Sequence, residues 1–219
     1  MWCIGKLTSE FRQRMYDVLE LYQRPYEVAE PVVCLDEKSK QLLEQTRRPM
    51  EARPGAPAKE DYEYKRAGTR NIFVAVEPKG GQRHVTVTAR RTKVDFVNFV
   101  GHLVECVYVK ASKIHLVLDN LNTHFQNSFV EVLGDLRAMA VLARVEFHHT
   151  PKHASWLNMA EIEIGIMERQ CTGRRIGTEV ALRSEIAAWQ QRRNDAGQTI
   201  QWSFTRQDAD AKLSRHYVS

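Results

Sequence analysis

The sequence of 219 residues lacks features that define several large classes of protein. No apolar run approaches the roughly 18 residues that a membrane-spanning helix needs. The first residues, MWCIGKLTSEFRQ, contain no apolar core of a secretory signal, so we expect a cytoplasmic protein. No G-x-x-x-x-G-K-[S/T] loop is present, and nothing therefore points to the use of ATP.

Cysteine is also scarce. Cys3, Cys34, Cys106 and Cys171 are far apart in the sequence, and no C-x-x-C pair occurs. This pattern predicts reduced thiols rather than a disulfide framework or a zinc ribbon. Neither serine nor cysteine stands in a recognisable nucleophile motif, so a covalent protein intermediate is not predicted.

The residues that are present describe a basic globular protein, with 43% hydrophobic residues and a mean hydropathy of -0.46. The net charge of +5 favours an acidic partner such as nucleic acid. Residues 78–94, PKGGQRHVTVTARRTKV, contain five basic residues and no acid. The segment could be the solvated rim of a hairpin, but we favour a surface that binds phosphate. Its basic residues are Lys79, Arg83, Arg90, Arg91 and Lys93.

Apolar periodicity predicts helices and strands that alternate along most of the chain. Residues 37–47 could be helical or looped, and a long surface loop is expected at about 47–70, which is rich in proline, glycine and charge. The elements expected are a helix from near Thr8 to Pro25, strands at 32–35, 71–77 and 83–89, a helix from 93, a strand at 113–119, a helix at 128–142, a strand at 144–149, a helix from 157, and a helix that Thr178 caps. This order predicts an α/β protein with a mixed sheet covered by helices on both faces.

Four acidic residues follow or interrupt apolar segments. Asp36 ends VVCLD and Asp119 ends LVLD. Ligands gather where neighbouring strands of an α/β sheet end, although an aspartate there can also cap the next helix. Glu161 and Glu163 lie in an apolar helix and point about 200° apart, so they cannot share one site. Either glutamate could also be exposed or paired with an arginine.

Three segments, CLDEKSKQ, LVLDNLNTHF and TPKHASWLNMAEIE, resemble in that order the catalytic blocks of DDE transposases from mariner-related bacterial insertion sequences. The second segment resembles the family pattern Asp-Asn-x-x-x-His, and the third resembles Leu-Asn-x-x-Glu. The matched positions are Asp119, Asn120, His124, Leu157, Asn158 and Glu161. The resemblance covers nearly the whole chain, and it selects Glu161 over Glu163. The interval from Asp119 to Glu161 is longer than is usual in the family.

The resemblance implies a ribonuclease-H-like fold with a mixed five-stranded sheet. It also implies that Asp36, Asp119 and Glu161 are catalytic and bind metal. Hard carboxylate oxygens suit Mg²⁺ or Mn²⁺, and two such ions about 3.5–4 Å apart can clamp an in-line phosphoryl displacement. We expect Asp36 to bridge both ions. Asn120, His124 and Asn158 are expected to assist, although Asn120 and His124 could equally be a turn residue and a helix-start residue.

The implied function is a DNA transposase that hydrolyses phosphodiesters at transposon ends and transfers the 3′-hydroxyl into target DNA. The expected partner is DNA, and analogy with the family adds a second copy of the chain as a homodimer. We expect a helical segment at 1–29, the catalytic core at 30–168 and a helical extension at 169–219. The family's N-terminal helix-turn-helix modules are expected to be missing. The alternatives are a non-catalytic DNA-binding or dimerisation remnant and another ribonuclease-H-like nuclease.

Further residues near these blocks have two interpretations each. Lys152 and His153 are expected to approach the DNA backbone, and Arg174 and Arg175 either contact phosphate or are solvated. A zinc cluster of His148, His149 and His153 is disfavoured, because adjacent residues of a strand face opposite ways. Trp156 is expected to pack at the start of its helix rather than to stack on a base.

Overall fold

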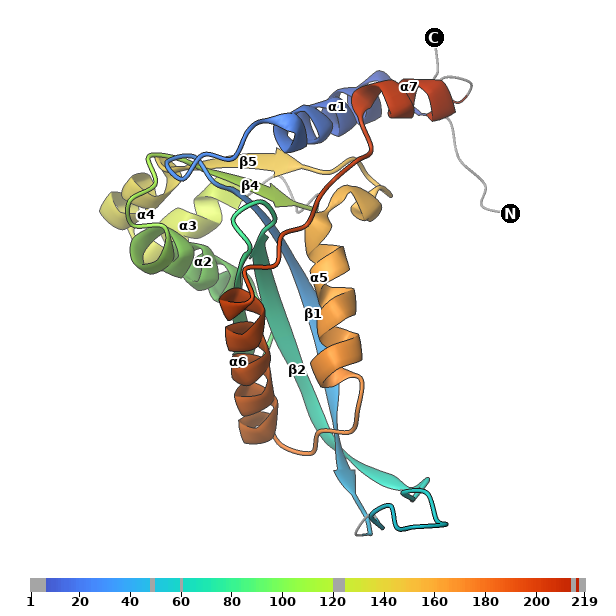
Figure 1. Ribbon diagram of the computed structural model, residues 1–219. Helices are drawn as coiled ribbons and strands as arrows, with labels where there is room; N and C mark the ends of the chain where they lie inside the picture. Colours follow the sequence, from blue (N-terminus) through green and yellow to red (C-terminus); the bar gives the residue numbers. More distant parts are fainter. Residues whose placement is uncertain (1–6, 48–49, 60, 120–124, 214–215, 217–219) are drawn as a thin grey trace.

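A computed structural model of the chain describes residues 7–47, 50–59, 61–119, 125–213 and 216 (Figure 1). Its centre is a five-stranded sheet in the order β3-β2-β1-β4-β5. Antiparallel pairing joins β1 to β2 and β2 to β3, whereas β4 runs parallel to both β1 and β5. The mixed sheet is the one that the sequence predicts. The strands are β1 (Val32–Gln45), β2 (Tyr64–Glu77), β3 (Gln82–Thr88), β4 (Ile114–Leu118) and β5 (Val145–His149).

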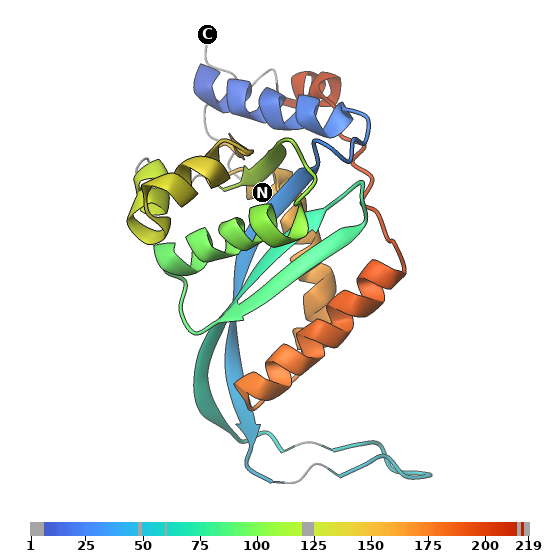
Figure 2. The same ribbon diagram turned by 90° about the vertical axis from the view of Figure 1, so that its left-hand side faces the viewer.

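The hairpin of β1 and β2 is longer than expected, and it extends beyond the rest of the sheet (Figures 1 and 2). The pairing of the two strands begins with Cys34 opposite Val76 and ends with Gln45 opposite Tyr64. Residues 37–45 are therefore strand, and the expected loop at 47–70 ends before Tyr64. The outer part of this hairpin is polar, so its sequence lacks the apolar–polar alternation that predicts a half-buried strand. The hydrogen bonds between the two strands form the hairpin there. Consequently Asp36 lies within β1, not at its end as expected.

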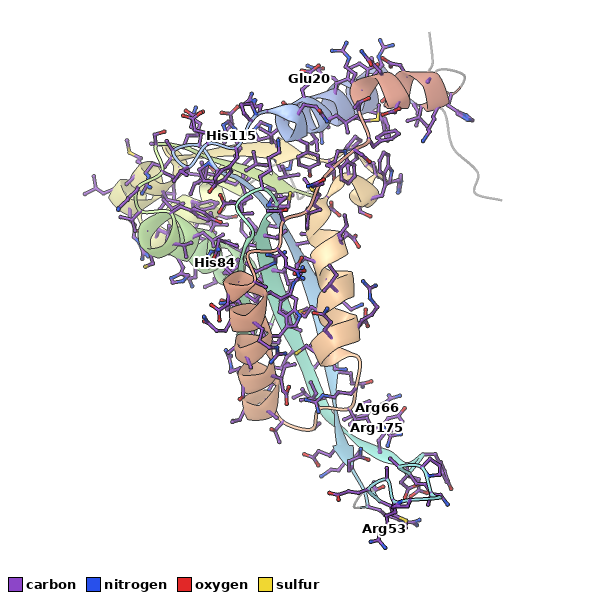
Figure 3. The ribbon with its side chains drawn as sticks, in the orientation of Figure 1. Glu20, Arg53, Arg66, His84, His115 and Arg175 are labelled. Atoms are coloured by element: carbon purple, nitrogen blue, oxygen red, sulfur yellow. The ribbon has the colours of Figure 1, made fainter. Side chains whose placement is uncertain are left out.

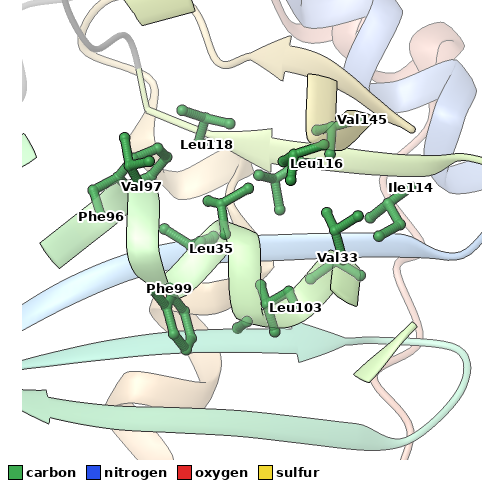
Figure 4. Close-up of a cluster of buried hydrophobic side chains, with 14 of the residues drawn as sticks. Val33, Leu35, Phe96, Val97, Phe99, Leu103, Ile114, Leu116, Leu118 and Val145 are labelled. Carbon is green, nitrogen blue, oxygen red and sulfur yellow. The ribbon is translucent and has the colours of Figure 1, made fainter. Parts of the chain in front are cut away.

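One face of the sheet is covered by α2 (Lys93–His102), a π-helical turn (Leu103–Val107), α3 (Phe125–Leu133) and α4 (Asp135–Leu142). Side chains from these helices pack on alternate residues of β1 and β4, including Val33, Leu35 and Leu116 (Figure 4). The sequence predicts one helix at 128–142. The structure has two, because Gly134 adopts a φ of 76° that ends α3.

The opposite face is covered by α1 (Ser9–Gln23), α5 (Met159–Met167), a second π-helical turn (Glu168–Thr172) and α6 (Glu179–Asp195). α1 and the start of α5 bury Cys34 and Val117, and α6 and the end of α5 bury Ile72 and Val74. Thr178 caps α6 as predicted, and α1 begins near Thr8 as predicted, with Thr8 as its cap. An unpredicted helix, α7 (Arg206–Leu213), packs beside α1 (Figures 1 and 2). Within the described ranges, no helix is both long and apolar enough to cross a membrane.

Candidate active site

The pairing of β1 with β4 brings Asp36 and Asp119 together. In these parallel strands Val32 pairs with His115, and Cys34 pairs with Val117. Two residues further along each strand stand Asp36 and Asp119, on strands about 4.8 Å apart. Cys34 and Val117 both face α1 and α5. Side chains alternate along a strand, so the two aspartates face the same helices.

The third carboxylate is placed by the start of α5. Asn158 caps this helix, because its Oδ1 accepts a hydrogen bond of 3.1 Å from the Ala160 N–H. Its Nδ2 donates to the carbonyl of Leu35 at 2.9 Å, directly before Asp36. Glu161 lies in the first turn of α5 and is exposed. The fully buried Asn158 therefore fixes the end of α5 that carries Glu161 against the strand that carries Asp36.

Asp36 is affected electrostatically by the other two carboxylates. Burial raises the pKa of Asp36 to about 7, and the charges of Asp119 and Glu161 act in the same direction. The N–H of Glu37, which donates to Asp36 Oδ1 at 2.7 Å, opposes this rise. Burial also raises the pKa of Glu37, although Arg91 counteracts it. Gathered acids of this kind favour a bound cation, which would remove their mutual repulsion.

Thr150 is a site residue that the sequence interpretation missed. Its hydroxyl donates to Asp119 Oδ1 at 3.0 Å, and its side chain is buried. The pairing of Leu118 with His149 explains the contact, because Asp119 and Thr150 each follow directly after those residues. The available signal was the position of Thr150 at the end of a strand. That signal has meaning only once β5 is known to lie beside β4.

The donor set suits a hard divalent cation. Asp36, Asp119 and Glu161 all offer carboxylate oxygens, which Mg²⁺ and Mn²⁺ prefer over nitrogen and sulfur ligands. The three come from different elements, and Thr150 and Asn158 hold two of those elements in place. Asn120 and His124, which were expected to assist, lie outside the described residues.

Glu163, the rejected alternative to Glu161, is wholly buried on another side of α5. Its carboxylate accepts hydrogen bonds from Arg83 and Arg193, each with an Nε to Oε1 distance of 2.9 Å. The expectation that Arg83 contacts DNA is therefore wrong. The reason is tertiary: Asn194 of α6 exchanges hydrogen bonds with the backbone N–H and carbonyl of Arg83, and this places α6 over the edge strand β3.

The other basic residues of the 78–94 segment, Lys79, Arg90, Arg91 and Lys93, are exposed. Arg91 lies with its Nε 3.8 Å from Oε1 of Glu37, the residue that follows Asp36. Lys93 pairs with Glu131, and Lys79 donates to the carbonyl of Arg24. Lys152 and His153 are also exposed, in the turn after Thr150. These residues remain candidates for contacts with DNA.

Arg174 and Arg175 lie away from the carboxylates. Arg174 pairs with Glu185 at 2.5 Å. Arg175 donates to Gln45 at 3.1 Å and to the carbonyl of Asp61 at 2.6 Å, near the end of the hairpin (Figure 3). The strand from Asp36 to Gln45, at about 3.3 Å per residue, spans about 30 Å. The structure therefore does not bring these two arginines to the site.

Trp156 packs at the start of α5. Its ring stacks on that of Trp202, with centroids 6.4 Å apart and an angle of 17° between the planes. The ring of Phe204 meets it edge-on at 5.5 Å. About half of the Trp156 side chain is nevertheless exposed, at 46%.

Comparison with known protein families matches residues 31–183 to the family described as DDE superfamily endonuclease. The chain belongs to this family. The match begins just before β1 and extends into α6, so it contains all three carboxylates of the candidate site. No curated protein sequence matches the chain.

Solved structures of the Mos1 transposase share the fold of this DDE endonuclease. The mariner Mos1 paired-end complex with Mg has a TM-score of 0.59 at 15% identity, over 100% of this chain and 66% of the other. The paired-end complex with left transposon end has a TM-score of 0.56 at 14% identity, over 87% and 57%. The chain thus spans about three fifths of the Mos1 chains it matches. The ribonuclease-H-like fold, predicted from the sequence, is confirmed.

Proposed function

We propose that the chain is the catalytic part of a DNA transposase from the mariner-related bacterial insertion sequences. The observation that carries the proposal is that Asp36 and Asp119 occupy equivalent positions along the paired strands β1 and β4, and that the start of α5, which carries Glu161, is hydrogen-bonded to β1. Membership of the DDE endonucleases supports it. The reaction proposed is hydrolysis of phosphodiesters at transposon ends, followed by transfer of the 3′-hydroxyl into target DNA.

The three carboxylates would hold two Mg²⁺ or Mn²⁺ ions. Mos1 complexes have been solved with Mn and with Mg, which supports this choice of cation. Bound there, such ions would supply activation of the attacking water or 3′-hydroxyl and stabilisation of the leaving oxygen. Thr150 holds the Asp119 carboxylate through its 3.0 Å hydrogen bond, and Asn158 holds the turn that bears Glu161. These contacts fix the ligand geometry before substrate arrives.

DNA is the proposed substrate, both as transposon ends and as target. The exposed residues Arg91, beside Glu37, and Lys152 and His153, in the turn after Thr150, would contact its backbone. Mos1 has been solved in paired-end complexes and in a pre-cleavage transpososome, which supports DNA as partner. A homodimer that pairs two ends is part of the same proposal.

Nicking of supercoiled plasmid by the purified chain tests the chemistry. We expect nicking in Mg²⁺ or Mn²⁺ and none in EDTA. Glu161→Gln and Asp119→Asn should lower the rate by more than about 100-fold, because each removes a ligand. Glu168→Gln is the matched control, because Glu168 is an exposed glutamate in the π-helical turn that continues α5. Equal rates for Glu161→Gln and Glu168→Gln would contradict the assignment.

A second assay separates a transposase from another ribonuclease-H-like nuclease. A labelled duplex with a free 3′-hydroxyl at the transposon end is incubated with plasmid, and joined products are measured. Joining supports the transposase, whereas nicking without joining at any end sequence supports the other nuclease. DNA binding that is independent of metal and accompanied by no nicking would favour the non-catalytic remnant.

A further inference from the structure

A second group of potential metal ligands lies on β4 and β5, in contact with α1 through Asp17. His115 of β4 pairs in register with Glu146 of β5, and His148 follows two residues later on β5. All three side chains therefore point to the same face of the sheet. Among the described residues, these three form a cluster whose ligand atoms all lie within 4.8 Å of one another. Figure 3 shows His115 at this end of the molecule, near α1.

The distances within the cluster are those of a coordination site. His115 Nδ1 lies 3.0 Å from His148 Nε2, and Glu146 offers one carboxylate oxygen 3.7 Å from the first and another 3.8 Å from the second. Zinc binds nitrogen at about 2.0–2.1 Å in tetrahedral sites, which separates its ligand atoms by about 3.3 Å. One ligand atom from each residue lies within 4.8 Å of the other two, so the side chains would need shifts of at most about 1.5 Å to bind one ion.

The surroundings of the two histidines fit a metal ligand set. Asp17 of α1 lies 2.7 Å from the far nitrogen of His148, an arrangement that orients histidine ligands in many zinc proteins. Both imidazoles are nearly buried, whereas the Glu146 side chain is 46% exposed and leaves the site open on one side. Two positively charged side chains beside the cluster act against a bound cation. Arg24 lies 3.3 Å from His115 Nε2, and Lys113 lies 3.3 Å from Glu146.

We propose that His115, Glu146 and His148 bind one Zn²⁺ ion, with water in the remaining position. Two nitrogen donors and one carboxylate select a transition metal over Mg²⁺, so the site differs in chemistry from the three carboxylates. The ion would join β4 and β5, the two strands that lead into Asp119 and Thr150, and Asp17 would extend the connection to α1. The disfavoured cluster of His148, His149 and His153 is not the one that forms, because the partners of His148 come from β4 and from its own face of β5.

Zinc binding by the full metal-free chain, measured by competition with a chromogenic chelator, tests the proposal. We expect one Zn²⁺ per chain, and the same stoichiometry in Asp36→Asn, which alters only the carboxylate site. Glu146→Gln and His148→Ala should weaken binding by at least about 100-fold, and Asp17→Asn by about 10- to 100-fold. His149→Ala, next to His148 on the same strand, is the matched control and should bind normally.

Thermal unfolding keeps the test valid if His148→Ala folds poorly. Zn²⁺ should raise the midpoint of the wild type and of His149→Ala, but not that of Glu146→Gln, whose changed residue is exposed enough to leave the fold intact. Equal zinc affinity in the wild type and Glu146→Gln would overturn the proposal. So would loss of the bound zinc in Asp36→Asn, because the ion would then belong to the carboxylate site.

Discussion

At the residue scale, two glutamates of α5 have opposite environments although only one position separates them. Glu161 is exposed beside the aspartates, and Glu163 is buried between two arginines. The helical period predicts that they diverge, but it does not tell which one faces the site. Resemblance to the family selects Glu161, and the structure supplies the physical reason that Glu163 is occupied elsewhere.

Glu163→Gln should lower the free energy of unfolding by about 3–5 kcal/mol, because it leaves Arg83 and Arg193 without their buried counter-ion. Glu161→Gln should leave stability within about 0.5 kcal/mol of the wild type, since its side chain is exposed. Urea unfolding of both variants measures the difference. Similar stabilities for the two variants would show that the buried ion pairs do not form as described.

His84 should make the protein sensitive to acid. Burial lowers the pKa of this histidine from 6.5 to about 4, with the charge of His102 as a second cause. Between these pH values the unfolded chain binds a proton that the folded chain excludes, so the free energy of unfolding falls as the pH falls. The loss is on the order of 2–3 kcal/mol, complete near pH 4 and absent above about pH 7.

Comparing His84→Phe with the wild type from pH 4 to 8 measures this contribution. As the pH falls, the unfolding free energy should decrease more in the wild type than in His84→Phe. His153→Gln, at an exposed histidine, is the control and should follow the wild-type curve. A constant difference between His84→Phe and the wild type across this range would contradict the lowered pKa.

At the scale of elements, short connections between helix ends and strands build the site. Asn158 satisfies the first turn of α5 and also the carbonyl of Leu35, so one side chain fixes a helix to a strand. Thr178 caps α6 in the ordinary way, through the Ala181 N–H at 3.2 Å. The two caps are chemically similar, but only Asn158 adjoins the carboxylates.

Asn158→Ala and Thr178→Ala should each lower the free energy of unfolding by about 1–2 kcal/mol, the usual effect of losing an N-cap. Asn158→Ala should also lower the metal-dependent nicking rate by about 10- to 100-fold, because Glu161 loses its fixed position. Thr178→Ala should nick at the wild-type rate. Equal rates in the two variants would mean that Asn158 stabilises α5 without positioning Glu161.

The sequence predicts most elements but not the length of the β1–β2 hairpin or the break at Gly134. Strong apolar periodicity predicts α1, α2, β4 and β5. Cap residues mark where the helices α1 and α2 begin. The outer part of the hairpin is polar, and its strands exist because each provides the other's hydrogen bonds. The sequence likewise does not predict the left-handed φ of Gly134, because the helical pattern continues on both sides of it.

At the scale of the whole molecule, the sequence points to the three acids and to Asn158, but not to Thr150. Asp36 and Asp119 follow apolar runs, so a pattern reveals them. Thr150 depends on which strands are neighbours, and the burial of Arg83 depends on where α6 packs. Neither fact is local. The expected basic surface illustrates the same limit, since Arg83 is buried and Arg175 supports the far end of the hairpin.

The position of bound Mn²⁺ in crystals of the chain, located by anomalous scattering, tests the central claim most directly. We expect Mn²⁺ within coordination distance of Asp36 and Asp119, with Glu161 completing the site, and loss of this signal in Asp36→Asn. This result would show that the three carboxylates form one metal centre. Mn²⁺ that binds the crystal elsewhere, with none near either aspartate, would contradict the account.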